Sequence, residues 1–428
     1  MTTDISIFDR PTEVTDDLRA SAREAGWPEG LLERAAELRV PRHMMEWWIK
    51  HERETIHHVQ QYLDGRERLM FGTMRARQAT WNDSEGLADL YANSPEEIGD
   101  WEITVERSPN AVAQFRLQEH VSISVLEDRG VILAATADSG RNTVVGGKRT
   151  SVHIASAWRV RKEFRGKGLS KLLRHAEGPA VGWFGLFNYY YIRSQNFAAL
   201  GWIKSFIPDS VNEPQREGDV PGIPVTVLHL SASPRRGDGS GIRLARRSDL
   251  RRCLQLINRT HKGCDLFRPY SQEFLEQRLD DPYWGEKPEF WEPVYGWPDY
   301  YVLEDNGRIV ACGGVWDKGK NVREVWRHKT TGETQTFDCT ALLDFGYGEG
   351  REDAMAQLIG HFIELTNNLG RSYLVAAVEH LPSLVPHLDD YQPESETRAL
   401  HWQKYDRDRD NWVTDTSLTR LYTDLAYW

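Results

Sequence analysis

The chain has 428 residues, a length that predicts about three domains of roughly 150 residues each. Hydrophobic residues make up 40% and charged residues 27% of it, the usual balance of a soluble globular protein. The 53 basic and 64 acidic residues leave a net charge of −11. This balance argues against a general nucleic-acid binder, because a phosphate backbone requires a basic surface.

No apolar run approaches the ~20 residues that span a bilayer, and the first residues lack the basic and apolar regions of a signal peptide. The four cysteines include no C-x-x-C pair, which suits a reducing compartment better than a disulfide framework or a zinc site. We therefore expect a cytoplasmic, multidomain protein with neither a membrane nor a nucleic acid as partner.

Residues 15–65 have the apolar spacing of helices. One of these helices is expected to begin at Pro41, a favoured first helical position, and to end near Gly65. The His and Glu residues at 51–58 could share a face of it, but one helix supplies too few ligands to hold a metal. Residues 1–71 are thus interpreted as a helical N-terminal module without a metal site.

Two six-residue stretches in the rest of the chain resemble each other. Val125-Leu-Glu-Asp-Arg-Gly130 and Val302-Leu-Glu-Asp-Asn-Gly307 each precede an apolar run, and an Asp/Asn-containing turn before Gly between apolar runs predicts a hairpin. A second match lies upstream in the same order, with residues 75–83 corresponding to 242–249. The offsets of 177 and 167 residues favour a tandem duplication over chance.

Residues 233–241 are rich in Pro, Gly and Ser and predict a linker between the two repeats. The first repeat then covers residues 72–232, and the second covers residues 242–428. Each has the pattern of a mixed α/β fold, with several strands, a glycine-rich turn, a helix and closing strands. In the second repeat, the Trp- and Pro-rich segment 282–298 predicts a loop at a domain interface or a pocket wall, and 418–428 predicts a last strand.

The glycine-rich turn of the first repeat is the strongest signal in the sequence. Arg161-Lys-Glu-Phe-Arg-Gly-Lys-Gly-Leu-Ser170 lies between a strand expected over 151–160 and a helix from 171. Free backbone N–H groups and the positive end of the helix dipole meet in such a turn, and glycine lets the backbone approach a phosphate closely. Seven basic residues and one acid lie between positions 159 and 174. The pattern predicts an anion site.

Residues 160–170 resemble the signature loop of the GNAT superfamily of acyl-CoA-dependent N-acyltransferases, written Arg/Gln-x-x-Gly-x-Gly/Ala. Arg165 and Gly168 match this loop, and Ser170 replaces its last small residue. The resemblance implies two tandem GNAT-like mixed-sheet domains, with acetyl-CoA or another acyl-CoA as co-substrate of the first. It also implies which residues bind the pantetheine and the pyrophosphate: Trp158, Arg159, Val160, Arg165, Gly166, Lys167, Gly168, Leu169 and Ser170.

A second family landmark concerns the group that protonates the leaving thiolate. Asn196-Phe-Ala-Ala-Leu-Gly-Trp202 resembles a helix end of the family, and Phe197 takes the place of its usual tyrosine. A phenylalanine cannot donate a proton. Tyr190 and Arg193 precede Phe197 by seven and four residues, so they would share its face of the expected helix. Tyr190 is the candidate proton donor, and another group or solvent is the alternative.

An amine nucleophile must also lose a proton to a base. His153 lies on the strand before the loop, and Glu119 lies beside His120 near the preceding strand. Both are candidates, and a structural or exposed role is the alternative for each. The sequence contains no G-x-S-x-G, H-E-x-x-H or Cys/His nucleophile motif.

The second repeat presents a different turn. A family-like register there is Arg351-x-x-Ala354-x-Ala356, with alanine in place of the first glycine. Acidic residues, among them Asp344 and Glu349, surround it and would repel a pyrophosphate. We therefore expect this repeat to keep the fold without tight acyl-CoA binding, as a structural or substrate-shaping domain. An active second site or another ligand is the alternative.

These features predict an acyltransferase that moves an acetyl or short acyl group from acyl-CoA to the amine of a small molecule or peptide, in a chain that could form a homodimer. Two alternatives stay open. One is a non-catalytic acyl-CoA-binding or scaffold protein. The other is a GNAT-fold enzyme of different thioester chemistry, such as O- or S-acyl transfer or decarboxylation.

Overall fold

The computed structural model describes most of the chain, which forms two compact units. The small unit consists of residues 1–78, 124–136 and 158–179, and the large unit consists of residues 79–123, 137–157 and 180–428. The described residues are 13–38, 40, 42, 45, 46, 49, 59, 60, 63, 64, 67, 73–108, 110–176, 187–193, 196, 223–231, 240–280, 293–406, 411–413, 418 and 420–427. Three strands contribute one end to each unit: β4 (Ser122–Asp128), β5 (Val131–Val145) and β6 (Lys148–Val160).

The small unit begins with helices α1 (Asp16–Glu24) and α2 (Leu31–Glu37), which confirm the helical prediction for these residues. Strand β1 (Met74–Gln78) pairs antiparallel with β4, and helix α6 (Leu169–Ala176) follows β6. The apolar faces of these elements share one buried cluster, which includes Leu18, Leu32, Leu126, Leu133, Leu169 and Leu173. Burial of this common face holds the helices to the strand ends.

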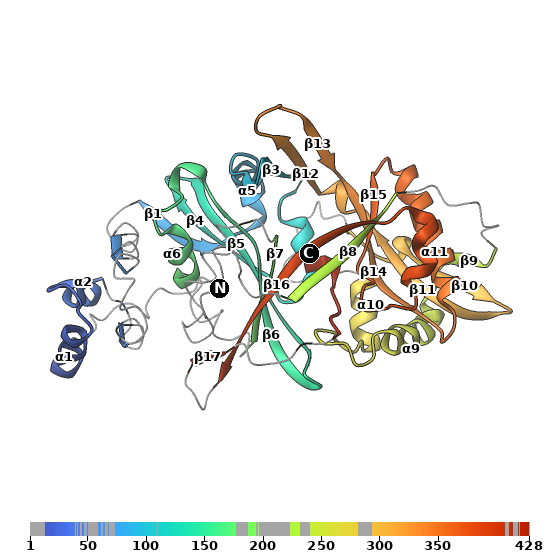
Figure 1. Ribbon diagram of the computed structural model, residues 1–428, viewed down its shortest axis with the longest axis horizontal. Coiled ribbons are helices and arrows are strands. Elements are labelled where there is room, and N and C mark those ends of the chain that lie inside the picture. Colours follow the sequence, from blue (N-terminus) through green and yellow to red (C-terminus); the bar gives the residue numbers. More distant parts are fainter. Residues whose placement is uncertain are drawn as a thin grey trace. The chain divides into compact units, whose positions relative to one another are not determined.

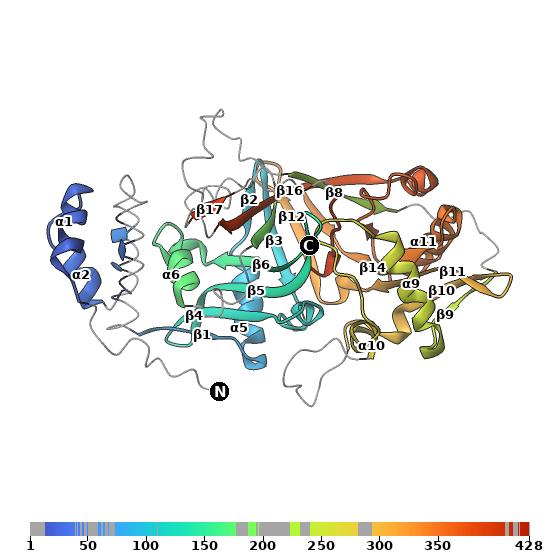
Figure 2. The ribbon, with the colours of Figure 1, turned by 90° about the horizontal axis from the view of Figure 1, so that it is seen from below.

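The large unit is built on a mixed sheet with the strand order β5-β6-β7-β16-β8-β15-β14-β11-β10-β9 (Figures 1 and 2). A short strand, β17 (Asn411–Val413), pairs with β16. The other strands are β7 (Phe187–Ile192), β8 (Ile223–Leu230), β9 (Ile242–Leu244), β10 (Tyr300–Asp305), β11 (Arg308–Trp316), β14 (Cys339–Tyr347), β15 (Tyr373–Ala376) and β16 (Glu394–Asp406).

With the predicted repeat boundaries, two strands of this sheet are exchanged between the repeats. β16 belongs to the second repeat and pairs antiparallel with β7 of the first. β8 belongs to the first repeat and pairs antiparallel with β15 of the second, and β8 and β16 also pair with each other. Since a strand of each repeat completes the ladder of the other, the backbone hydrogen bonds of both depend on the full chain.

A smaller sheet also joins the repeats, in the order β13-β12-β3-β2. Strands β2 (Glu96–Ile98) and β3 (Trp101–Arg107) come from the first repeat, and β12 (Val322–His328) and β13 (Thr334–Phe337) come from the second. β3 and β12 pair antiparallel along their whole lengths. This ladder is a second backbone connection between the repeats.

Helices cover both faces of the second repeat's part of the large sheet (Figure 1). α9 (Leu250–Thr260) and α10 (Gln272–Asp280) share a buried cluster with Ile309 of β11. α11 (Glu352–Asn368) shares another cluster with Val310, the next residue of that strand. Because successive side chains of a strand point to opposite faces, α9 and α11 lie on opposite sides of the sheet.

Both predicted hairpins are confirmed, between β4 and β5 and between β10 and β11. At their turns, Arg129 and Gly130 have φ of 49° and 81°, and Asn306 and Gly307 have φ of 49° and 71°. Two positive φ values are the mark of the turn whose twist suits a two-residue hairpin. The matching turns support the predicted duplication, and its boundaries near residues 72, 233 and 241 stay predictions.

Two assignments made from the sequence are wrong. The segment with Tyr190, expected in a helix, is strand β7, because its run of aromatic residues favours a pleated strand and neighbours pair with it on both sides. The closing segment, expected as a strand, makes an isolated bridge between Leu421 and Asp265 and then forms a 3₁₀ turn over Leu425–Tyr427.

Several other predictions fall on residues outside the described part of the chain. They concern Phe197, the linker residues 233–239, and most of the stretches 41–65 and 282–298. No described helix has the length and apolar character needed to cross a membrane.

Candidate functional site

The predicted anion loop lies in the small unit, between β6 and α6. The Arg161 backbone N–H donates to the Leu133 carbonyl oxygen at 2.9 Å, and the Arg161 Nε donates to the Ile132 carbonyl oxygen at 2.7 Å. A 3₁₀ turn follows over Lys162–Phe164. These hydrogen bonds to β5 fix the point at which the chain leaves the sheet and enters the loop.

Two glycines shape the loop. Gly166 and Gly168 have φ of 73° and 75°, which residues with a side chain rarely adopt. The Leu172 N–H donates to the Gly168 carbonyl oxygen at 3.1 Å, so α6 begins directly after the second glycine. The first N–H groups of a helix have no carbonyl partner inside the helix. The N–H groups of Leu169 and Ser170 are therefore at the end of α6 that adjoins the loop.

The loop exposes its cations and buries its apolar residues. Arg165 and Lys167 are exposed, and the Lys167 Nζ lies 4.9 Å from the centre of the Phe164 ring. Leu169 is 2% exposed and joins the buried cluster of the small unit. A cationic turn held at the start of a helix can bind an anion through both its charge and its backbone amides.

The three strand residues predicted to contact pantetheine form the end of β6 in the small unit. Trp158 and Val160 pack against the small unit's buried cluster, and Arg159 is 7% exposed. They lead directly into the loop, so the strand and the loop present one continuous stretch of backbone from 158 to 170.

In the large unit, β6 and β7 run parallel over a short ladder. The paired residues of β6 are Val152 to Ile154, although β6 continues to Val160. In the second repeat, β14 and β15 have the same arrangement. The paired residues of β14 are Cys339 to Ala341, although β14 continues to Tyr347. Ligand sites of α/β proteins commonly lie beyond the carboxyl ends of such parallel strands.

His153, one of the two candidate bases, lies on β6 in the large unit. Its Nε2 is 2.8 Å from the Oδ1 of Asp138 on β5, and both side chains are at most 5% exposed. A neighbouring carboxylate fixes the orientation of an imidazole ring, as in many acid–base pairs. Asp138 is not among the residues predicted from the sequence, and no local signal distinguishes it, because β5 carries other polar residues beside it, such as Ser139 and Arg141.

Tyr190, the candidate proton donor, is buried on β7. Its neighbours Tyr189 and Tyr191 contact each other edge-on at 5.6 Å between ring centroids, and Tyr189 is in register with Ile154. Side chains alternate between the two faces along a strand. Tyr189 and Ile154 are on one face of the sheet, so Tyr190 and His153 are on the other. Burial raises the pKa of Tyr191 to about 12, which makes it a weaker acid than an exposed tyrosine.

Arg193 directly follows strand β7 and does not lie in the helix that was expected there. Its Nη2 lies 2.7 Å from a Glu324 carboxylate oxygen, and its Nη1 lies 3.5 Å from Glu96. Burial alone would raise the pKa of Glu324, but Arg193 lowers it to about 2. Arg193 therefore links β7 to strands β2 and β12 of the smaller sheet.

Glu119, the other candidate base, is 3% exposed and forms an ion pair with Arg268. Protonation of a buried carboxylate in an ion pair removes its attraction to the paired cation, so this pairing opposes the role of a base. Among the residues that the structure describes, no group of three or more His, Cys, Asp or Glu side chains is arranged to hold a metal ion.

The second repeat has a comparable strand and a shorter turn. Asp344 of β14 has φ of 49°, as Ala157 of β6 has φ of 53°. A tyrosine hydroxyl donates to each carbonyl oxygen, from Tyr300 to Asp344 at 2.9 Å and from Tyr91, in helix α5 (Ser84–Ala92), to Ala157 at 2.5 Å. Counted from these two residues, α6 begins twelve residues later and α11 eight residues later.

The predicted register of Arg351, Ala354 and Ala356 on the signature loop is therefore wrong. Arg351 immediately precedes α11, and the two alanines lie inside that helix, at 2% and 7% exposure. The turn is formed instead by residues 348–350, in which Gly350 has φ of 63°. Glu349 in this turn pairs with Arg259 of α9.

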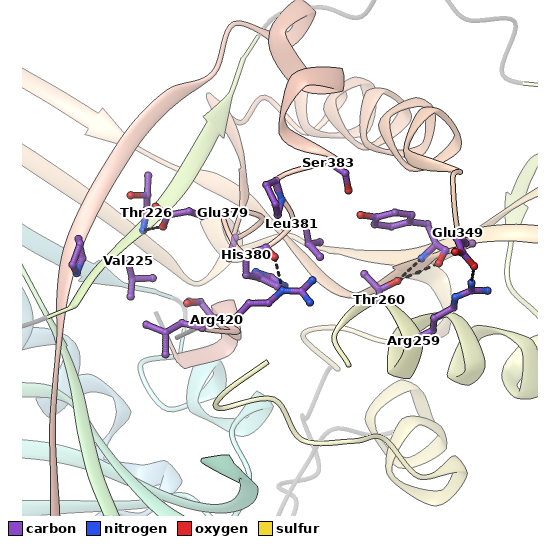
Figure 3. A pocket seen from close by; sticks show the side chains of 17 residues that line it. Val225, Thr226, Arg259, Thr260, Glu349, Glu379, His380, Leu381, Ser383 and Arg420 are labelled. Atoms are coloured by element: carbon purple, nitrogen blue, oxygen red, sulfur yellow. Dashed lines mark hydrogen bonds and ion pairs between the residues drawn. The ribbon is translucent and has the colours of Figure 1, made fainter. Parts of the chain in front are cut away.

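A cavity of about 840 Å³ lies in the large unit beyond the ladder of β14 and β15 (Figure 3). Its lining comes from β8, the end of α9, the end of β14 with the turn after it, the segment 377–383 that follows β15, and the segment 420–423. The polar lining residues include Thr226, Thr260, Tyr347, Glu379, His380 and Arg420. They come from segments far apart in the sequence, so no local sequence motif predicts this cavity.

A neutral histidine pair lies beside the cavity. The Nδ1 of His261 is 2.9 Å from the Nε2 of His380, and the Nε2 of His261 is 2.9 Å from the Phe345 carbonyl oxygen. Burial lowers the pKa of His261 to about 3. Since a carbonyl oxygen only accepts, His261 donates from Nε2 and accepts at Nδ1 from His380.

A buried ionic network joins the two repeats within the large unit. The Arg278 Nε donates to Asp344 at 2.9 Å, and its Nη2 lies 3.4 Å from Asp424. Asp424 is also 3.4 Å from Arg141 of β5, whose Nη2 donates to the Tyr189 hydroxyl at 2.9 Å. All four charged side chains are at most 5% exposed, so each depends on its partners for stabilisation.

No protein-family model and no curated protein sequence matches this chain. Among solved structures, it is similar to Saccharomyces cerevisiae N-myristoyltransferase with bound myristoyl-CoA, at 12% identity and a TM-score of 0.54 over 82% of this chain and 86% of that chain. Another structure of that enzyme with bound myristoyl-CoA gives 11% identity and a TM-score of 0.53 over 82% and 90%. The chain therefore shares the fold of N-myristoyltransferase, which confirms the predicted mixed α/β fold class.

Proposed function

We propose that the chain is an acyl-CoA-dependent N-acyltransferase whose first repeat binds the coenzyme. The observation that carries this proposal is the loop after β6, which combines two positive-φ glycines, exposed Arg165 and Lys167, and the start of α6. The similarity of fold to an N-myristoyltransferase solved with bound myristoyl-CoA supports the same class of co-substrate.

In this proposal the coenzyme pyrophosphate lies on the loop. The N–H groups of Gly168, Leu169 and Ser170 donate to its oxygens, and the positive end of α6 and the two exposed cations balance its charge. Pantetheine runs along the β6 backbone from Trp158 to Val160. The acidic, shorter turn of the second repeat supports a single coenzyme site per chain.

The acceptor is an amine, whose nitrogen attacks the thioester carbonyl carbon. His153 takes the proton of the amine, while Asp138 orients the imidazole. The tetrahedral intermediate collapses, the C–S bond breaks, and Tyr190, on the same face of the sheet as His153, returns a proton to the thiolate. Tyr190 regains that proton from His153, so the cycle closes without a metal or a redox step.

The first test measures coenzyme binding. The purified full chain is titrated calorimetrically with acetyl-CoA and with myristoyl-CoA, and one site per chain is expected for the acyl length that fits. Gly168→Asp is expected to weaken binding at least a hundredfold, because it places a carboxylate against the pyrophosphate at a φ of 75°.

Gly350→Asp is the matched control, since Gly350 has φ of 63° in the corresponding turn of the second repeat. It adds the same charge and similar backbone strain, and coenzyme affinity should stay within twofold. Equal affinity of the Gly168→Asp variant and the unmodified chain would overturn the assignment of the loop.

The second test measures transfer. The chain is incubated with the acyl-CoA it binds and with panels of small amines and of peptides with free N-termini, and products are identified by mass. An amide product supports the proposal. An ester, a thioester or released carbon dioxide would assign different thioester chemistry, and binding without any product would leave a coenzyme-binding protein.

The role of His153 has its own test. His153→Gln is expected to lower kcat by about 10²–10⁴ while coenzyme affinity is retained. Asp138→Asn should lower kcat less. An unchanged kcat in the His153 variant would show that another group is the base.

A further inference from the structure

The cavity of the second repeat has no part in the proposed acyl transfer. Its volume of about 840 Å³ is within the range of sites that enclose a small organic molecule. In Figure 3, side chains from five segments line it, with Thr226 and Glu379 at one end, Thr260 and Glu349 at the other, and Arg420 between them.

Arg420 is the cation that distinguishes this cavity. Its Nε donates to the His380 carbonyl oxygen at 2.9 Å, and its Nη1 is 3.5 Å from the Lys262 carbonyl oxygen. Both acceptors are neutral, and among the described residues no carboxylate pairs with Arg420. A guanidinium anchored through Nε keeps its outer N–H groups for a carboxylate, which it binds in a bidentate manner.

The other charged groups of the lining are occupied or neutral. Arg259 pairs with Glu349, and a Glu379 oxygen accepts the Thr226 backbone N–H at 2.7 Å. Burial, with His261 and Arg420 nearby, lowers the pKa of His380 well below its ordinary value, so its ring is uncharged near neutral pH.

The lining therefore carries two cations and two carboxylates. This balance disfavours a pyrophosphate, which brings at least two negative charges close to Glu349 and Glu379. It suits a ligand with one negative charge placed at Arg420.

The rest of the lining suits an uncharged body. Val225, Ala377, Leu381 and Leu421 supply apolar surface to the same cavity, and the hydroxyls of Tyr347 and Ser383 supply neutral polar groups. A ligand of this kind buries its apolar part while its acidic group meets the guanidinium.

We propose that the cavity is a binding site for an organic monocarboxylate, with the carboxylate on Arg420 and the uncharged body against Val225, Leu381 and Leu421. The site lies beyond the parallel ladder of β14 and β15, as the end of β6 lies beyond its ladder with β7. This inference stands whether or not the chain transfers acyl groups.

The test titrates the full chain with octanoate and, as an uncharged match, with octanamide. Saturable binding of octanoate at one site per chain is expected, and octanamide should bind at least tenfold more weakly. Arg420→Gln should weaken octanoate binding at least tenfold, and Arg420→Lys should retain part of the affinity because the charge remains.

Arg351→Gln is the matched control, since Arg351 pairs with Asp305 at 2.9 Å beside the same turn but does not line the cavity. It should leave octanoate affinity unchanged. Ser383→Trp provides a second variant that keeps Arg420 and its hydrogen bond to His380, and fills the cavity from an exposed position; it should cause the same loss. Thermal unfolding confirms that each variant is folded.

Two results would overturn the proposal. One is the absence of saturable octanoate binding by the unmodified chain. The other is octanoate binding that neither Arg420→Gln nor Ser383→Trp changes, which would place the ligand elsewhere, for example at the acyl site proposed for the first repeat.

Discussion

The two repeats share a strand, a turn and a helix, and they differ in what the turn presents. In the first repeat the turn is long, exposes Arg165 and Lys167, and enters α6 through Gly168. In the second, α11 begins four residues sooner, and the turn carries Glu349. The strand geometry before each turn is nevertheless the same.

That geometry is held by contacts that the turns do not make. Ala157 and Asp344 both have positive φ, and a tyrosine hydroxyl binds each carbonyl oxygen. The exchanged strands β8 and β16 then tie both repeats into one sheet. The comparison teaches that the strand geometry does not depend on the residues of the turn. One repeat can therefore lack the anion site and keep the fold.

The largest expected effect concerns Asp344, the positive-φ residue of the second repeat. Asp344→Ala removes the carboxylate that Arg278 contacts at 2.9 Å and leaves a buried guanidinium with Asp424 as its remaining charged partner, beside the Leu117 carbonyl oxygen. We expect the free energy of unfolding to fall by about 3–5 kcal/mol, measured by chemical denaturation. Backbone strain is a small part of this cost, because alanine already occupies the equivalent position 157.

Asp353→Ala is the control for this prediction, since Asp353 is an exposed acid in the first turn of α11. Its effect should stay below about 0.5 kcal/mol. A loss for Asp344→Ala as small as that of the control would show that the ionic network does not stabilise the second repeat.

A smaller effect is expected from the histidine at the end of α9. His261 follows α9 where Asn93 follows α5, so this titrating group is specific to the second repeat. Burial lowers the pKa of His261 to about 3, from about 6.5 in the unfolded chain. The unfolded chain therefore binds the proton first, and stability falls as the pH drops below 6.5. The contribution of His261 at pH 5 is a loss of about 2 kcal/mol relative to pH 7.

The measurement compares denaturant unfolding at pH 7 and pH 5 for the unmodified chain and for His261→Gln. The variant should show a smaller decrease between the two pH values, even if it is less stable at both. Burial raises the pKa of Asp299 to about 6, which works in the opposite direction and is common to both proteins. Equal decreases in the two proteins would contradict the assignment.

The smallest effect is expected at Ala157, the positive-φ residue of the first repeat. Ala157→Gly relieves a φ of 53° and also increases the entropy of the unfolded chain, so the two effects nearly cancel. The free energy of unfolding should change by less than about 0.5 kcal/mol. Ala155→Gly, two residues earlier on β6, gains no such relief and should cost about 1 kcal/mol. Equal losses would remove the parallel between the two strands.

Local patterns predicted much of the frame. The turns that end at Gly130 and Gly307 predicted both hairpins, and the strand, the glycine-rich turn and the start of the helix around Gly168 lie where the pattern placed them. These features depend on residues close together in the sequence. The helix expected around Tyr190 is wrong because the aromatic run of residues 187–192 favours a strand, and the resemblance to the family's helix end does not extend to it.

The site in the second repeat could not be predicted in the same way. Arg420, His380 and Thr226 reach one cavity from segments separated by tens to hundreds of residues, so only the tertiary structure brings them together. The pairing of Asp138 with His153 joins two strands across a hairpin, and the pattern of neither strand specifies its partner. Arg351 was misplaced because a shortened turn shifts every residue after it.

The ionic network has a consequence for how this protein is made. Arg141 lies in the first repeat, and its carboxylate partner Asp424 is 283 residues further along the chain. At synthesis rates of roughly 5–20 residues per second, about 15–60 s pass between the two residues. During that interval the first repeat holds an arginine whose buried position is not yet neutralised. The buried environment of Arg141 is therefore completed only after Asp424 has been made.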